Sequence, residues 1–386
     1  MPIMSILDND LYKFTMQKAV LDCFPGVEVE YQFFNRNPAH KFTDEFHDKL
    51  WVNLEAMSKL RLSDEEYGFL QEKVSFLGEP YLKWLKDYRY DPSCIKTKIV
   101  DGKLDLRFKG TWEQRILWEV PLMALISECF FNILEPWQFL DYERRTVEKG
   151  YTLFANDVNF TDFGTRRRRN FAIQDMVVSL FKERCGDKFK GTSNVYLAMK
   201  RNTRPLGTMA HEWIMGISAL EGLRHANRYA MKHWSNSYKG NLGTALPDTF
   251  GTEAFFEDFD NYYARLFDSV RHDSGDPYEF GERVIKHYNS LGINPMHKSL
   301  IFSDGLDVNK AIDIKTYFKR KINTSFGIGT HFTNNVPDSP ALNMVIKMIM
   351  CNGIPVVKLS DTPSKAIGDK DALRVARWTF FKTPLD

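Results

Sequence analysis

Strand-like and helix-like patterns alternate in one direction through most of this chain, from about residue 135 onward. Each short apolar run leads into small or acidic residues and then into a helical pattern. Repeated βα units of this kind predict a parallel sheet, and about seven of them favour a closed or nearly closed barrel over an open sheet. We expect strands that end at Gly191-Thr192-Ser193-Asn194, near His211, within 269–276, within 299–305, at Phe326 and at Leu359. We expect helices over 167–183, from Pro277 onward and over 307–319.

The first part of the chain reads as a separate α/β module. A hairpin over 94–109, turning at Asp101-Gly102, is its clearest element. We expect an N-terminal α/β domain over residues 1–115 and a barrel domain over 116–386, with the C-terminal tail packing back on the N-terminal domain. The other elements expected near this end are a helix over 8–24 capped by Asp8 or Asn9, a strand over 27–34, helices over 43–60 and 63–73 behind Thr43 and Ser63, and a helix over about 113–134.

The positive and negative charges of the chain nearly balance, which limits the classes of binding partner that we expect. Lys plus Arg is 52 against 50 for Asp plus Glu, a net charge of +2. This gives no general attraction to nucleic acid or to an anionic membrane, so any anion site is local. The five scattered cysteines contain no CxxC pair, and 1–10 does not resemble a signal peptide. The longest apolar tract, 121–134, is too short and too interrupted to span a bilayer. We expect a soluble, cytoplasmic protein.

The stretch Arg204–Trp213 combines Pro, Gly and apolar residues, and it predicts a buried strand that ends near His211. A helix is expected from Trp213 to Trp234. His211 then lies at the C-terminal edge of the sheet, where it could act as a nucleophile or an acid–base, or simply be a partly buried structural histidine. Met215 stands where a zinc protease motif has its second histidine, which excludes that chemistry.

Four other segments at strand ends share a chemistry of small residues, carboxylates and bases. Gly327-Ile328-Gly329-Thr330 can expose backbone N–H groups to a phosphate, although a tight turn explains the same residues. Asp273, Asp276 and Asp304 could bind Mg²⁺ or ribose hydroxyls, or they could cap the helices that follow them. Arg166–Arg169 follows Phe163-Gly164-Thr165, and this loop could offer one or two guanidiniums to a phosphate or carboxylate while Phe163 stacks on a planar ring or packs in the core.

Taken together, these motifs resemble the nicotinate phosphoribosyltransferase family over nearly the whole chain. No single motif is decisive, but seven of them in the same order are specific. They are Asp10-Leu11-Tyr12-Lys13, Asp162-Phe163-Gly164-Thr165-Arg166, Gly191-Thr192-Ser193-Asn194, Gly207-Thr208-Met209-Ala210-His211-Glu212, Arg271-His272-Asp273-Ser274-Gly275-Asp276, Ser303-Asp304-Gly305 and Phe326-Gly327-Ile328-Gly329-Thr330.

The resemblance implies a fold and an activity. The fold is an N-terminal α/β (α+β) domain with an irregular, incomplete TIM-like barrel, usually in a head-to-tail homodimer. The activity is an ATP-dependent ligase-type glycosyl transfer that joins nicotinate to phosphoribosyl pyrophosphate (PRPP) in NAD biosynthesis. Mg²⁺ is the implied cofactor, held by the pyrophosphate with Asp273 or Asp304 as possible ligands, and ATP is a co-substrate.

The resemblance also implies residue roles. His211 would be transiently phosphorylated by ATP and, with Asp273 and Arg166, form the catalytic set. Phe163 and Tyr12, the latter from a partner subunit, would enclose the pyridine ring, and a neutral Ser193 beside arginines would suit a carboxylate. The remaining implied substrate-binding residues are Thr165, Arg271, Asp304, Gly305, Gly327, Gly329 and Thr330.

Three other functions remain open from the residues. A phosphoribosyltransferase for nicotinamide or quinolinate differs only in the base that it prefers. A barrel protein that binds a phosphorylated ligand without catalysis would share the same strand-end motifs. An RNA-binding role through Arg166–Arg169 is the weakest alternative, because the net charge is +2 and the basic run is short.

Overall fold

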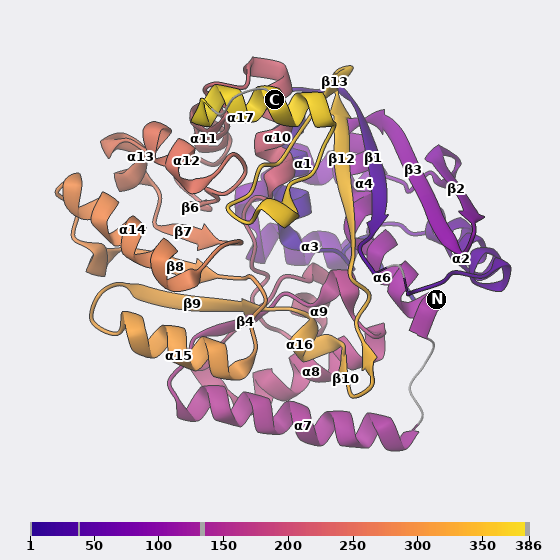
Figure 1. Cartoon of the computed structure of the whole chain (residues 1–386). Coiled ribbons are helices and arrows are strands. Elements are labelled where there is room, and N and C mark those ends of the chain that lie inside the picture. Colours follow the sequence, from indigo (N-terminus) through magenta and orange to yellow (C-terminus); the bar gives the residue numbers. More distant parts are fainter. Residues whose placement is uncertain (1, 38, 132–135, 383–386) are drawn as a thin grey trace.

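The computed structural model describes residues 2–37, 39–131 and 136–382, and it has two main sheets. One is antiparallel and the other is parallel (Figure 1). This arrangement confirms the mixed α/β class, whereas the incomplete closure of a barrel and the limits of the two domains stay predictions.

The antiparallel sheet has five strands in the order β13-β12-β1-β3-β2. The Asp101-Gly102 turn joins β2 to β3 with φ values of 52° and 73°, the left-handed conformation of the hairpin turn that these residues favour. In Figure 1, β12 from the end of the chain lies beside the indigo β1, with which it pairs in antiparallel register. The strands are β1 (Glu28–Asn35), β2 (Ile95–Val100), β3 (Lys103–Thr111), β12 (Met344–Cys351) and β13 (Ile354–Pro355).

Helices cover this antiparallel part and join it to the parallel part. Thr43 caps α2 by accepting from the Phe46 N–H at 3.2 Å, and Ser63 caps α3 in a reciprocal box with Glu66, as the sequence predicts. The bounds are α1 (Leu11–Cys23), α2 (Asp44–Met57), α3 (Asp64–Lys73), α4 (Glu79–Asp87), α5 (Trp112–Arg115), α6 (Glu119–Phe131), α10 (His211–Glu221), α11 (Ala226–Tyr238) and α17 (Lys370–Phe381).

The parallel sheet has six strands in the order β5-β4-β9-β8-β7-β6. Its strands are short and their central residues are buried, as expected where helices cover a parallel sheet; Val270, Leu300 and Phe326 are all 0% exposed. The strands are β4 (Phe160–Asp162), β5 (Phe189–Thr192), β6 (Thr244–Ala245), β7 (Ser269–His272), β8 (Ser299–Phe302) and β9 (Asn323–Ile328).

The helices around this sheet follow the predicted alternation. α14 begins at Pro277 after the Asp276 cap, whose carboxylate accepts from two backbone N–H groups. The bounds are α7 (Pro136–Ala155), α8 (Phe171–Arg184), α9 (Val195–Lys200), α12 (Thr252–Asp258), α13 (Asn261–Leu266), α14 (Pro277–Ser290), α15 (Val308–Phe318) and α16 (Thr330–Thr333), and a small ribbon is formed by β10 (Asn335–Val336) and β11 (Ser339–Pro340). None of the described helices is both long and apolar enough to cross a membrane.

Four predicted elements differ in the structure. The stretch before His211 is not a strand of either sheet but an extended connection, and His211 is the first residue of α10. The helix expected over 213–234 breaks at Gly222, whose φ of 97° is incompatible with a continuing helix. The helix expected over 113–134 divides into α5, a 3₁₀ turn and α6, and its last residues, 132–134, lie outside the described part. Only 354–355 of the expected strand 354–359 is a strand, and it belongs to the antiparallel sheet.

The expected cap of α1 is also wrong, for a reason that matters to the fold. The N-cap is Asp10, while Asp8 is fully buried and holds Arg168 through two hydrogen bonds of 2.7 and 2.9 Å. Arg168 also donates to Glu128 at 2.8 Å. The second half of the basic run therefore packs inside the protein, and Arg169 lies over the Phe131 ring at 4.0 Å.

We predict that Arg168→Gln lowers the free energy of unfolding by about 3–5 kcal/mol, because it leaves the buried Asp8 carboxylate without its cation. Urea unfolding followed by circular dichroism measures the change. Arg184→Gln, on an exposed side chain of α8, is the matched control and should change the free energy by less than about 0.5 kcal/mol. Equal stability of the two variants would contradict a buried ion pair at Arg168.

Candidate active site

Most of the predicted site residues lie around the C-terminal ends of the parallel strands. Phe163 and Arg166 follow β4, Ser193 follows β5, Arg271 and Asp273 lie at the end of β7. Because β4, β5, β7, β8 and β9 run in the same direction, the loops that follow them meet at one edge of the sheet. Two sizeable cavities and a small one open there.

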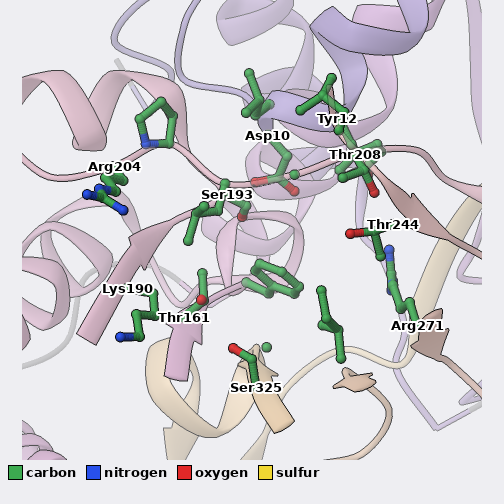
Figure 2. Close-up of a pocket in the computed structure, with 18 of the residues that line it drawn as sticks. Asp10, Tyr12, Thr161, Lys190, Ser193, Arg204, Thr208, Thr244, Arg271 and Ser325 are labelled. Atoms are coloured by element: carbon green, nitrogen blue, oxygen red, sulfur yellow. Dashed lines mark hydrogen bonds between the residues drawn. The ribbon is translucent and has the colours of Figure 1, made fainter. Parts of the chain in front are cut away.

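The first cavity, which we call the lumen, measures about 420 Å³. Figure 2 shows its labelled side chains, with Tyr12 and Asp10 on one wall and Ser325 opposite them. Tyr12 and Phe163 of the same chain both line it, whereas the family resemblance implies that Tyr12 comes from a partner subunit. The buried Tyr12 hydroxyl has no hydrogen-bond partner within the described residues.

Ser193 lines the lumen, but its hydroxyl proton is already committed. Ser193 Oγ donates to Asp10 Oδ1 at 2.7 Å. Asp10 itself lines the lumen and was not identified as a site residue from the sequence, which placed it inside the helix predicted over 8–24. Burial raises the pKa of Asp10 despite the bond from Ser193 and the nearby Arg166 charge. The carboxyl therefore accepts a proton more readily than an exposed aspartate.

The second cavity, which we call the phosphate cavity, measures about 550 Å³ and shares Phe163, Arg166, Arg271 and Gly327 with the lumen. Its other lining residues include three from the predicted set, Gly305, Gly329 and Thr330, together with Arg167, Ser303 and His331. The basic run thus divides by function: Arg166 and Arg167 face the cavity, whereas the next two arginines are structural.

Two predicted residues lie elsewhere. Thr165 is fully buried and accepts a hydrogen bond from Gln174 at 3.0 Å, and it lines none of the three cavities. Asp304 is also absent from their linings, and its carboxylate pairs with Lys365 at 2.5 Å. The adjoining Gly305 does reach the phosphate cavity, with a φ of 55°.

His211 lies in the small cavity of about 50 Å³, with Arg166, Arg271 and Asp273. Its Nε2 atom is 2.7 Å from Asp248 Oδ1 and 3.7 Å from Asp273 Oδ2. A ring nitrogen that faces a carboxylate carries the proton, so the Nδ1 atom keeps its lone pair in the neutral ring. Burial and the Lys358 charge lower the pKa of His211, which favours that neutral, nucleophilic form at pH 7.

Asp248 is the main site residue that sequence reasoning missed. It follows β6, which has only two residues and carries too short an apolar run to be recognised as a strand. Ser274 Oγ donates to its other oxygen at 2.6 Å, and Lys358 Nζ lies 2.8 Å from the same oxygen. Although burial opposes ionisation, His211 and Lys358 hold the pKa of Asp248 well below its ordinary value. Asp248 is therefore a fixed negative partner that orients His211.

Asp273 is held by cations of its own. Arg271 donates to it at 2.8 Å and Ser303 at 3.0 Å. Burial alone would raise the pKa of Asp273, but Arg271 and His211 hold it below the ordinary value. The ligand atoms of His211, Asp248 and Asp273 lie within 4.8 Å of one another. Lys358 and Arg271 already neutralise the two carboxylates. This donor set therefore does not fit a divalent cation bound by protein ligands alone, and Mg²⁺ would also need oxygen ligands from a substrate.

Lys347, like Asp10 and Asp248, could not be recognised as a site residue from the sequence. It lies on β12 of the antiparallel sheet and lines the small cavity with His211 and Asp273. No carboxylate lies within 4.0 Å of its Nζ atom in the part of the chain that the structure describes. Burial lowers the pKa of Lys347 to about 8, opposed by Glu119. Its cation is thus available to an anionic group in the small cavity.

The fold and the site together define a mixed α/β protein with cavities at the C-terminal edge of a parallel sheet. The sequence matches the nicotinate phosphoribosyltransferase (NAPRTase) N-terminal domain over residues 7–127 and the nicotinate phosphoribosyltransferase (NAPRTase) family over residues 158–384. The chain belongs to the nicotinate phosphoribosyltransferase family.

Individual relatives agree over the whole length. A nicotinate phosphoribosyltransferase of Methanosarcina acetivorans is 48% identical, with 100% of both chains covered, and nicotinate phosphoribosyltransferase 2 of Pseudomonas aeruginosa is 42% identical over 94% of this chain and 93% of its own. The crystal structure of nicotinate phosphoribosyltransferase from Porphyromonas gingivalis superposes with a TM-score of 0.95 at 38% identity, covering 98% of this chain and 99% of the other. The roles of the individual site residues stay predictions.

Gly327 shows how tightly the aromatic wall is built. A Cβ atom added at this position would lie 2.2 Å from the Phe163 ring. The glycine is thus needed for Phe163 to reach the junction of the two cavities, a reason different from the phosphate contact that the sequence suggests.

We predict that Gly327→Ala lowers the free energy of unfolding by about 1–3 kcal/mol, because the Phe163 ring must move to make room. Gly68→Ala in α3 is the matched control: its added Cβ meets nothing within 4 Å, and it should stabilise the protein by about 0.5–1 kcal/mol. Urea unfolding of both variants measures the effect. A Gly327→Ala variant as stable as the wild type would contradict the tight contact with Phe163.

Proposed function

We propose that this chain synthesises nicotinate mononucleotide from nicotinate and PRPP, a step of NAD biosynthesis from nicotinate. One observation carries the proposal: the lumen and the phosphate cavity meet where the Phe163 ring and the guanidiniums of Arg166 and Arg271 line both of them. An aromatic face beside fixed cations suits a flat, anionic ring, and membership of the family supports the choice of nicotinate.

The transfer depends on the placement of the two substrates and on the stabilisation of developing charge more than on proton transfer. The pyridine nitrogen attacks C1 of the ribose, the C1–O bond to pyrophosphate breaks, and its electron pair leaves with the pyrophosphate. That nitrogen carries no proton near pH 7, so no general base is required. Phe163 and Tyr12 would hold the ring, and Arg166 would hold the anionic groups. The ionised Asp273 would stabilise the positive charge that develops on the ribose.

Mg²⁺ fits this site as a companion of the pyrophosphate. Mg²⁺ is usually bound by one or two carboxylates together with substrate phosphates. Asp273 is the carboxylate that could contribute an oxygen to it, because it lines the small cavity beside the shared arginines. Asp304 is engaged by Lys365 and would first have to leave that pair. The ion would neutralise charge on the leaving group.

ATP hydrolysis would act through His211. Its neutral Nδ1 attacks the γ-phosphorus of ATP, the bond to the ADP oxygen breaks, and ADP leaves; water later removes the phosphoryl group as phosphate. Asp248 would stabilise the imidazole in the required orientation through the 2.7 Å bond. Lys347 and Arg271 line the same small cavity, and their charges would attract the phosphoryl group. The added dianion would then change how tightly substrates bind.

A homodimer and a cytoplasmic location remain our predictions. The sequence suggests active sites shared between two subunits because Tyr12 would come from the partner. Tyr12 lines the lumen of its own chain, which weakens that argument. An isolated chain already lines the lumen with both aromatic residues.

The first test is chromatographic. Incubation with PRPP, Mg²⁺ and ATP should convert nicotinate to nicotinate mononucleotide, with kcat/KM roughly 10- to 150-fold above that for nicotinamide. One charge-assisted hydrogen bond from Arg166 or Arg271 to the carboxylate is worth about 1.5–3 kcal/mol, which gives this ratio. Omission of PRPP is the control and should give no product. Equal kcat/KM for the two bases would contradict a nicotinate enzyme.

The second test concerns coupling to ATP. His211→Asn should abolish ATP stimulation and ADP release while leaving slow synthesis without ATP, because the displacement at C1 does not use the imidazole. Synthesis and ADP are quantified in the same samples. His225→Asn is the matched control, since that histidine is exposed at the start of α11 and should leave coupling unchanged. Full ATP stimulation of His211→Asn would exclude a phosphohistidine at this position.

A further inference from the structure

The lumen is basic at both ends. One end, at the junction with the phosphate cavity, holds Arg166 and Arg271. Figure 2 shows Lys190 and Arg204 on the side of the lumen opposite Arg271, with Ser193, Thr161 and Ser325 between them. Lys190 is half-buried and Arg204 is exposed, so this second end faces solvent. The lumen is therefore reachable without crossing the phosphate cavity.

The backbone fixes the position of this basic pair. Lys190 lies on β5, and the Arg204 carbonyl accepts from the Thr192 N–H at 3.1 Å. Between them, Gly191 has a φ of 136°, and a Cβ there would lie 2.1 Å from the Arg204 oxygen. Only glycine allows the 204–206 segment to lie this close to β5. The two cations thus belong to a built edge of the lumen.

Their charges are not used within the fold. Neither Lys190 Nζ nor the Arg204 guanidinium has an ion pair or a side-chain hydrogen bond within the described residues. The contrast is with Lys200 and Arg201 nearby, which both bind Asp175, at 2.7 and 2.6 Å. Asp10, whose carboxyl group is the one found among the described residues that line the lumen, lies on the Tyr12 wall in Figure 2. The outer end of the lumen is therefore a positive opening.

The walls between the two ends are mainly apolar. Phe76, Leu206, Leu242 and Ile301 line the lumen together with Phe163. A low-dielectric passage with cations at its opening focuses the field and raises the local concentration of anions. A ligand that suits both features has a flat apolar body and one negative charge.

We propose that Lys190 and Arg204 form an outer anion site, which first binds the carboxylate of the aromatic substrate and guides it along the lumen to Phe163. The proposal rests on the proposed function, because it takes nicotinate as that substrate. It adds a consequence: the base can reach its site while PRPP fills the phosphate cavity.

The test is the double variant Lys190→Gln/Arg204→Gln, assayed over a series of salt concentrations. At low ionic strength kcat/KM for nicotinate should fall about 10-fold, the lower end of measured steering effects, and the difference should vanish at high salt. The values of kcat and of KM for PRPP should stay unchanged. Slow turnover of the uncharged nicotinamide should also be unaffected, which a general structural defect would not allow.

Lys182→Gln/Arg184→Gln is the matched control, since it removes the same charge from exposed positions of α8 outside the lumen. Equal salt dependence of the two double variants would overturn the outer anion site. If the KM for PRPP rises and the KM for nicotinate does not, the outer anion site is also overturned, and the two cations would instead bind the phosphate groups of PRPP. Wild-type protein that makes no nicotinate mononucleotide would instead refute the proposed function, so the two failures are distinguishable.

Discussion

The buried carboxylate of Asp8 is the interaction on which the arrangement of the site depends. It binds Arg168 from the loop after β4, and Asn194 from the loop after β5 donates to it at 2.7 Å. These two loops carry Phe163, Arg166 and Ser193, while Asp8 lies four residues before Tyr12. One carboxylate therefore fixes the N-terminal segment against two strand ends. An unpaired charge at this depth would be costly, so the three segments stay together as a unit.

This connection explains why the site is built from distant parts of the chain. Tyr12 comes from the first helix, Phe163 and Arg271 from the parallel sheet, and Lys347 from a strand of the antiparallel sheet. Lys358 and Arg271 hold the carboxylates of Asp248 and Asp273 beside His211, so that these two negative charges are compensated before a substrate binds. Groups oriented in advance need little reorganisation when charge develops in a reaction. Within the described residues, Lys347 at the centre and Lys190 and Arg204 at the outer end of the lumen form no ion pair, so their charges are available to anionic ligands.

Much of the fold could be predicted from local patterns. The capped helices α2 and α3, the Asp101-Gly102 hairpin and the strands that end near Asp273 and Phe326 all appear where the sequence indicates. The failures have physical causes. The segment before His211 has the apolar character of a strand but pairs with β5 only through one bridge at Pro205, since proline cannot donate to a ladder. The late apolar run at 354–359 joins the antiparallel sheet through tertiary pairing that no local pattern reveals.

The sequence by itself determined the alternation of strands and helices, the motifs at strand ends and the family, because each depends on residues that are neighbours in the chain. Only the tertiary structure decided which charged residues face the cavities. Arg166 and Arg168 are two residues apart and look alike in sequence, yet one lines the cavities and the other is buried against Asp8. Asp248 and Lys347 carry no local signal and acquire their place only through long-range packing. The electrostatics of a site depends on distances in space, and these are set by the packing of the whole chain.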